Sequence, residues 1–132
     1  GAVSLLVAAI GITNTMIMSI YERTKEIGIM KVIGASLKDI KRLFLFESAL
    51  IGFSGGVLGV GFSYLLSFII NKLAGPSFSD AIGAYGATKI SIIPFWLALA
   101  AMAFSGFIGI VSGYFPARRA MNLSALEAIR SE

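Results

Sequence analysis

The densest group of charged side chains lies between Tyr21 and Ser36, and long apolar runs stand on both sides of it. Glu22 and Glu26 alternate with basic residues at a spacing that pairs charges along a helix. Such an amphipathic segment can bind a soluble protein through ion pairs and apolar contacts. It can equally lie among lipid headgroups as an interfacial helix. The spacing alone does not choose between these two roles.

Residue types that support catalysis or bind transition metals are scarce. The sequence contains no cysteine and no histidine, which excludes a thiolate nucleophile, a disulfide framework and Cys/His metal sites. No nucleotide-binding glycine motif and no nucleophile elbow occurs. Glu47 is the one acidic residue inside an apolar run. We expect it at the membrane interface, near water or a basic residue, with a buried proton-relay carboxylate as the alternative. We therefore expect a chain that is not an enzyme, with no catalytic or metal-binding residues and no cofactor.

The elements that would hold these charges are membrane helices. Hydrophobic residues form 57% of the 132-residue chain and charged residues 14%, against about 45–50% and about 25% in soluble domains. Three apolar runs, at about 2–21, 43–71 and 90–117, are each long enough to cross a bilayer core as a helix. The sequence thus predicts an all-α membrane protein, one transmembrane domain over 1–132. A short helix is expected at about 22–33 and a tail helix at about 124–130, where Ser124 and Glu127 form a capping box.

Several residues mark boundaries or polar points within this arrangement. Gly34 is typical of a helix stop, and Ser36 precedes a helix that starts at Leu37. Pro94 fits the first turn of the third span, whereas Pro116 predicts a kink or an exit. In the first run, Thr13 and Asn14 either bond to a neighbouring helix or their own backbone, or mark a substrate path.

Small residues recur at four-residue spacing in the second and third runs. Such stripes let helices approach closely. The residues expected to pack helices together in this way are Gly52, Gly55, Gly56, Gly59, Ser105, Gly109 and Gly113.

The distribution of basic residues predicts the orientation in the membrane. Lysine and arginine concentrate in the first loop and the tail, while the loop at 72–89 carries only Lys72 and Lys89. By the positive-inside rule, the first loop and the carboxyl terminus are cytoplasmic. The net charge of +4 then reflects topology, and we expect the lipid bilayer, not nucleic acid, as the partner of these charges.

Two stretches carry a resemblance to a known family. VSLLVAAIGITNTMIMSIYERTKEIGIMKVIGAS and the tail ARRAMNLSALEAIRSE closely resemble FtsX-like permeases, the MacB-type subunits of ATP-binding-cassette (ABC) systems. ERTKEIGIMKVIGAS is the specific part, and Ser124 stands where that family commonly has a proline-containing turn. The resemblance covers nearly the whole chain. It implies helices two to four of a longer permease, without the first helix and the extracytoplasmic domain.

The resemblance also implies a role for the charged segment. In that family the corresponding segment is the coupling helix, which binds an ABC ATPase subunit and transmits its motion to the extracytoplasmic domain. The implied docking residues are Glu22, Arg23, Thr24, Lys25, Glu26, Ile27, Gly28, Met30, Lys31, Gly34, Ala35 and Ser36. A second cytoplasmic contact is expected at Leu126, Glu127 and Ile129. Residues 2–33 would form a stiff connection interrupted only by Gly11 and Gly28.

The resemblance further implies partners and a location. The expected partners are an ABC ATPase that binds ATP and Mg²⁺, a second permease subunit, most simply an identical one, and an extracytoplasmic adaptor protein. The expected location is the bacterial plasma (inner) membrane. Two alternative functions stay open. One is an FtsX-like scaffold that regulates an extracellular cell-wall hydrolase, and the other is a fragment of an ion-coupled transporter. The transporter is disfavoured because the spans lack central ionisable groups.

Overall fold

The computed structural model describes residues 1–74 and 90–121, and this part of the chain is helical apart from short turns and a non-helical segment at 90–94. Its helices are α1 (Ala2–Glu22), α2 (Thr24–Val32), α3 (Leu37–Leu73) and α5 (Phe95–Met121). Three of them, α1, α3 and α5, are long and apolar enough to cross a membrane. The predicted all-α fold with three membrane helices is confirmed. The predicted tail helix at 124–130 lies outside the described residues.

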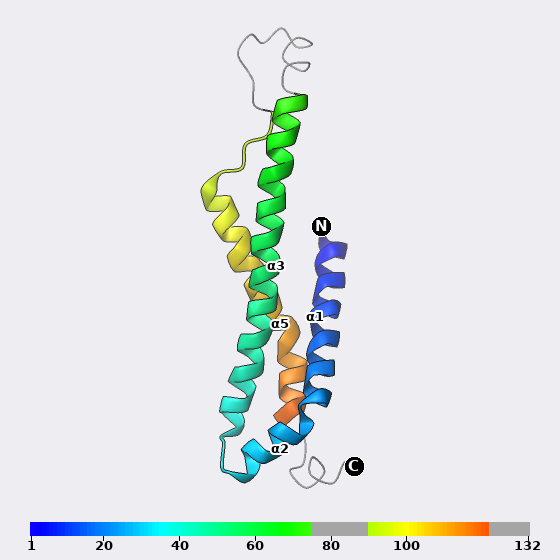
Figure 1. Ribbon diagram of the computed structural model, residues 1–132, viewed down its shortest axis with the longest axis vertical. Coiled ribbons are helices and arrows are strands. Elements are labelled where there is room, and N and C mark those ends of the chain that lie inside the picture. Colours follow the sequence, from blue (N-terminus) through cyan, green and yellow to red (C-terminus); the bar gives the residue numbers. More distant parts are fainter. Residues whose placement is uncertain (75–89, 122–132) are drawn as a thin grey trace.

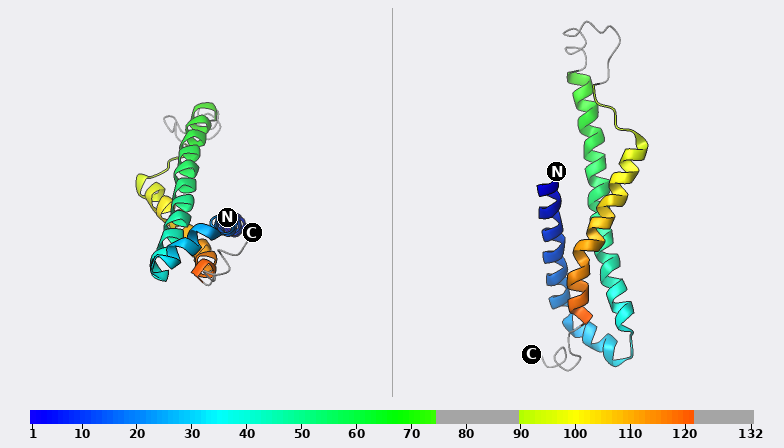
Figure 2. Two further views of the ribbon diagram at one scale, coloured as in Figure 1. Left: turned by 60° about the horizontal axis from the view of Figure 1, so that its bottom comes forward. Right: turned by 180° about the vertical axis from the view of Figure 1, so that it is seen from behind.

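The three long helices form an elongated bundle with α2 at one end (Figure 1). The most extensive contact joins α3 and α5, which cross along their lengths, and α1 packs mainly on α5. Viewed from behind and from the end, α2 runs obliquely from the lower end of α1 to the lower end of α3 (Figure 2). The chain therefore presents one short helix, lying across the bundle axis, at the end where three membrane helices converge.

The connections around α2 follow from local backbone chemistry. Gly34 has a φ of 95°, a conformation that glycine adopts at little cost. The amides of Ala35 and Gly34 donate to the carbonyls of Met30 (2.9 Å) and Lys31 (3.2 Å), which is the Schellman arrangement that ends a helix. Ser36 then caps α3 by accepting a hydrogen bond from the Lys38 amide at 3.2 Å. The stop at Gly34 and the start at Leu37 are confirmed.

The connection between α1 and α2 differs from the prediction. The helical path breaks at Arg23 (φ −101°, ψ 15°), whereas Gly11 and Gly28 both lie inside helices. The expected stiff connection over residues 2–33 is therefore two rods joined at Arg23. A physical reason is that the break lets α2 turn so that Ile27 is buried under the bundle.

The third span also differs at both ends. Residues 90–94 are not helical, and the Pro94 carbonyl accepts from the amides of Leu97 (3.0 Å) and Ala98 (3.3 Å), so Pro94 lies just before α5. At the other end, α5 continues through Pro116 to Met121. Since proline lacks an amide hydrogen, the carbonyl of Ser112, four residues earlier, loses its helical donor. The Thr13 hydroxyl of α1 lies 3.0 Å from that carbonyl oxygen and 2.9 Å from the Ala9 carbonyl oxygen one turn earlier in α1. Its single hydrogen compensates for the loss when it is directed toward Ser112.

Glycine and serine residues make the close contact between α3 and α5. A Cβ built on Gly52 would lie 2.5 Å from the Ser105 carbonyl oxygen, and one on Gly56 would lie 2.8 Å from Ser105 Cβ. On α5, a Cβ at Gly109 or Gly113 would collide with Ser48. Gly55 and Gly59 have nothing within 4 Å of the added Cβ. Among the described helices, Gly55 and Gly59 therefore make no close contact with α5, and their expected role in packing α3 against another helix stays a prediction.

Candidate functional site

The candidate docking site is α2, and its two faces have different surroundings. Ile27 is 1% exposed and Gly28 is also buried. Ile27 packs in a cluster with residues of every membrane helix, namely Met16 and Ile20 of α1, Ile40 and Phe44 of α3, and Ala117 and Ala120 of α5. Ile27 and Gly28 are therefore not available to a docking partner, which corrects their assignment as contact residues. They attach α2 to the bundle instead.

The apolar centre of the outward face of α2 consists of residues that the sequence prediction did not include in the site. Ile29, Val32 and Ile33 are 51%, 64% and 77% exposed. Lys25 and Glu26 are exposed beside them, and Met30 is half-buried. The outward face thus has an apolar centre with charges at one side, which is the composition of a protein contact surface. The spacing of positions 29, 32 and 33 in the sequence indicates one apolar face of the helix. Because apolar residues also occur on the opposite face, the sequence did not show which face is buried.

The remaining predicted docking residues lie at the two ends of α2. Glu22 and Arg23 are exposed at its beginning, and Thr24 is half-buried, with its hydroxyl donating to the Ile20 carbonyl at 2.9 Å. Gly34 and Ser36 are exposed at the turn into α3, and Ala35 is half-buried. The structure therefore keeps Glu22, Arg23, Lys25, Glu26, Gly34 and Ser36 on the surface. Leu126, Glu127 and Ile129 lie outside the described residues.

Lys31 links α2 to the carboxyl end of α5. Its ammonium group donates to the Met121 carbonyl oxygen at 2.8 Å, where the last carbonyls of a helix lack internal donors and attract positive charge. Desolvation lowers the pKa of Lys31 from its ordinary value. This residue was predicted to contact a docking partner. In the structure it is half-buried and already bonded within the chain.

The break at Arg23 is also tied to the bundle. The Arg23 guanidinium lies 3.8 Å from the Glu47 carboxylate on α3. Both side chains are partly exposed, so solvent screening keeps this ion pair weak. The position of Glu47 agrees with the expectation of an interfacial carboxylate near a basic residue.

A second polar cluster, missed by the sequence reasoning, lies at the opposite end of α3. The Asn71 side chain accepts from the amides of Ile90 and Ser91, both at 2.8 Å, and donates to the Ser91 carbonyl at 2.7 Å. Ser67 adds hydrogen bonds to Ser91, and Tyr64 bonds the Ile93 carbonyl at 3.3 Å. These bonds hold the non-helical segment before α5 against α3. Only the tertiary structure brings Asn71 and Ser91 together, since the two residues are 20 positions apart in the sequence.

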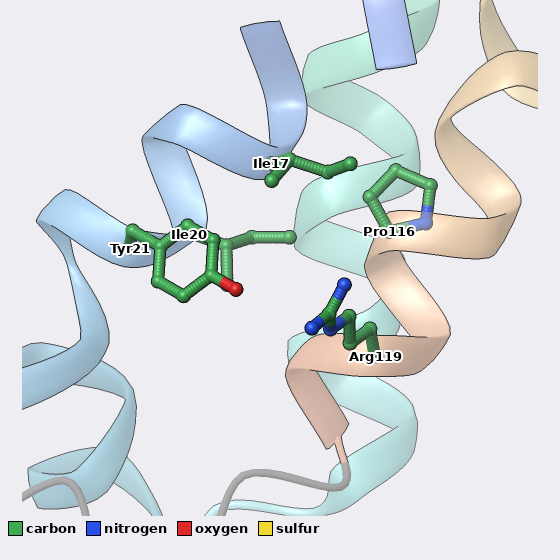
Figure 3. A pocket seen from close by; sticks show the side chains of 5 residues that line it. All are labelled: Ile17, Ile20, Tyr21, Pro116 and Arg119. Atoms are coloured by element: carbon green, nitrogen blue, oxygen red, sulfur yellow. The ribbon is translucent and has the colours of Figure 1, made fainter. Parts of the chain in front are cut away.

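A small cavity opens between α1 and α5 near α2. It has a volume of about 80 Å³ and is lined by Ile17, Ile20, Tyr21, Pro116 and Arg119. In Figure 3 the phenol oxygen of Tyr21 and the guanidinium of Arg119 point toward the same gap from opposite helices. Ligand sites for drug-sized molecules usually have volumes of about 300–1,000 Å³, so this cavity is too small for such a molecule.

Comparison with known proteins identifies a family of membrane permeases, in agreement with the three long apolar helices. The model of the FtsX-like permease C-terminal family matches residues 1–125. The chain belongs to this family. The resemblance inferred from the ERTKEIGIMKVIGAS segment is thereby confirmed, and with the three apolar helices it identifies a multi-pass membrane protein.

Several curated relatives of this FtsX-like chain are similar over nearly its whole length. It is 43% identical to the ABC transporter permease YtrF of Bacillus subtilis, covering 100% of this chain and 31% of the relative. It is 41% identical to an uncharacterized ABC transporter permease of Methanocaldococcus jannaschii, covering 99% and 31%. It is 39% identical to the macrolide export ATP-binding/permease protein MacB of Psychrobacter arcticus, covering 96% and 17%. The chain thus spans about a third or less of the length of these relatives.

Proposed function

We propose that this chain forms part of the membrane-spanning region of an ABC transporter permease, in which α2 binds an ABC ATPase and passes its movement to the helix bundle. Membership of the FtsX-like family and relatives named as ABC transporter permeases support the general role. ATP and Mg²⁺ would be bound by the ATPase, and α2 and the carboxyl terminus would face the cytoplasm, as the positive-inside rule predicts.

The observation that carries this proposal is the contrast between the two faces of α2. The outward face exposes Ile29, Val32 and Ile33, apolar groups that a protein partner could bury. The inward face inserts Ile27 among residues of all three membrane helices. Since well-packed interiors transmit displacement instead of absorbing it, movement of α2 would be passed to the ends of α1, α3 and α5 together.

The bond between Lys31 and the end of α5 supports the same proposal. It anchors the second half of α2 to the Met121 carbonyl at the end of α5, while Arg23 before the first residue of α2 lies near Glu47 of α3. Both ends of α2 therefore have a polar connection to a different membrane helix, in addition to the apolar contact at Ile27. An interfacial helix that only lay among lipid headgroups would need neither of these two connections.

The substrate and the subunit composition are also proposed by analogy. MacB relatives are named for macrolide export, and we propose export or efflux for the assembly that contains this chain, with a homodimer of permeases and an extracytoplasmic adaptor protein. The cavity of about 80 Å³ between α1 and α5 is smaller than a drug-sized site, which favours mechanical transmission over passage of a solute through this place.

The test separates docking from transmission by changing one face of α2 at a time. In the full-length permease with its ABC ATPase, Ile33→Asp should weaken ATPase binding about 30-fold, as loss of a central apolar contact typically does, while Ile33→Leu should bind normally. Ile27→Ala should retain ATPase binding but reduce the ATP-dependent change in distance between spin labels at the far end of α3 and on the ATPase.

Two outcomes would reject the proposal. Normal ATPase binding by Ile33→Asp would show that α2 is not the docking helix and would favour the interfacial role. An unchanged ATP-dependent distance change in a folded Ile27→Ala protein would show that the buried face does not transmit movement.

A further inference from the structure

The cavity between α1 and α5 combines features that a phospholipid headgroup requires, and its two polar groups, on Tyr21 and Arg119, lie outside the cluster that holds the docking helix. Its wall is apolar, formed by Ile17, Ile20 and Pro116, and its mouth carries the Tyr21 hydroxyl and the Arg119 guanidinium. A shallower cavity of about 350 Å³, lined by Tyr114, Phe115, Arg118 and Arg119, adjoins it through the shared Arg119. Within the described chain, neither set of lining residues includes an acidic side chain.

The depth of the cavity in the bilayer follows from its surroundings. Tyr21, Tyr114 and Phe115 are 57%, 47% and 68% exposed, and aromatic residues of this kind favour the boundary between headgroups and acyl chains. Arg118 and Arg119 lie in the last turn of α5, directly after its apolar span. The cavity mouth is therefore at headgroup level, and its Ile17 side is directed toward the hydrocarbon.

The electrostatics favour an anion. Within the described residues the ion pairs join Arg23 to Glu47 and Arg42 to Asp39, and neither involves Arg118 or Arg119. Lys41 lies 4.1 Å from the centre of the Tyr114 ring and adds positive charge beside the larger cavity. Arginine binds phosphate through several donors in a fixed geometry, and a tyrosine hydroxyl can supply one further donor.

We propose that the groove formed by these two cavities is a binding site for an anionic phospholipid. The headgroup phosphate accepts hydrogen bonds from Arg119 and Tyr21, and an acyl chain lies against Ile17 and Ile20. A free phosphate metabolite would leave this apolar wall without a partner, whereas a zwitterionic lipid would bring a cation toward Arg118. The bound lipid would join α1 to α5 near α2, so it would stabilise the arrangement of the end of the bundle that carries the docking helix.

The test uses the full-length protein in nanodiscs of phosphatidylcholine with or without phosphatidylglycerol, and counts retained lipids by native mass spectrometry. Phosphatidylglycerol should be retained preferentially, and Arg119→Gln should lower its affinity about tenfold, consistent with loss of a charge-assisted hydrogen bond. Tyr21→Phe should lower it less. Arg42→Gln is the matched control, because Arg42 is exposed at the same end of the bundle, carries the same charge and lies outside the groove; it should leave the affinity unchanged.

Four results would overturn the proposal. Equal losses in Arg42→Gln and Arg119→Gln would indicate general attraction to an anionic surface. Unchanged retention in both Arg119→Gln and Tyr21→Phe would exclude the groove. Displacement of the lipid by millimolar inorganic phosphate alone would indicate a free-phosphate site. A large gain in phosphatidylglycerol binding by Glu127→Gln would indicate that this carboxylate, not a lipid, is the natural occupant. None of these measurements depends on ATPase binding, so they stand apart from the docking test.

Discussion

The crossing of α3 and α5 predicts a specific difference between two glycines. In Gly109→Ala, the added Cβ would collide with the Ser48 carbonyl oxygen and lie 3.1 Å from Gly52 Cα. Both neighbours are backbone atoms, so no side-chain rotation relieves the contact. In Gly55→Ala, the added Cβ would meet nothing within 4 Å. The two variants make the same chemical change in membrane helices, but only one of them forces the helices apart.

The magnitude follows from the contact distances. Non-bonded carbon atoms prefer separations of about 3.5–4.0 Å, and a gap of about 0.5–1 Å already loses a quarter to a half of the dispersion energy. Relieving the collision at Gly109 requires a separation of this order and also lengthens the 2.6 Å hydrogen bond from Ser105 to the Gly52 carbonyl. Overpacking of this kind costs about 1–3 kcal/mol. The gain of about 1 kcal/mol in helix propensity from glycine to alanine is common to both variants and cancels in the comparison.

The assay is reversible unfolding of the purified protein in mixed micelles, with helix content followed by circular dichroism. Gly109→Ala should be less stable than Gly55→Ala by about 1–3 kcal/mol. Ser105→Ala, which removes the hydroxyl without adding volume, should lower stability by about 1 kcal/mol. Equal stabilities of Gly109→Ala and Gly55→Ala would refute the close contact and would mean that α3 packs through another face.

Two further predictions concern the polar contacts at the ends of the bundle. Asn71→Ala should lower stability by about 1–2 kcal/mol and speed amide hydrogen exchange at Ile90 and Ser91, because it removes three hydrogen bonds to these two residues. Asn14→Ala, at an exposed position in α1, is the control. Equal exchange rates in both variants would contradict the role of Asn71. Lys31→Met should keep most of the side-chain volume but lose the bond to Met121, so the rate of amide hydrogen exchange in Thr24–Val32 should rise several-fold. Lys31→Arg should retain protection. An unchanged exchange rate in Lys31→Met would show that this bond does not hold α2.

The sequence predicted those features that depend on local chemistry. The three spans follow from hydropathy and length, and the turn at Gly34 follows from the conformational freedom of one residue. The start of α5 was misplaced because residues 90–94 are equally apolar. They are not helical, and the amides of Ile90 and Ser91 donate instead to Asn71, a contact between distant parts of the chain.

The candidate site was predicted in its position but not in its orientation. Apolar residues occur on both sides of α2, so the sequence could not show that Ile27 is buried while Ile33 is exposed. The glycines of α3 pose the same problem. Gly52 with Gly56 and Gly55 with Gly59 have the same spacing, and only the position of α5 distinguishes the pair that is in contact. Which face of a helix is covered depends on its neighbours, whereas the existence of the helix depends mainly on its own residues.

The bond from Thr13 to the Ser112 carbonyl limits how the bundle can deform. Pro116 cannot donate to that oxygen. The Thr13 hydroxyl lies within reach of it at 3.0 Å, but would bond only to the Ala9 carbonyl of its own helix if α1 moved away from α5. An unsatisfied carbonyl in hydrocarbon costs several kcal/mol. Swinging α1 outward by itself is therefore an expensive deformation, whereas tilting or sliding α1 and α5 as a pair keeps the oxygen bonded. The deformations available to this bundle at low cost are therefore those in which α1 and α5 move together.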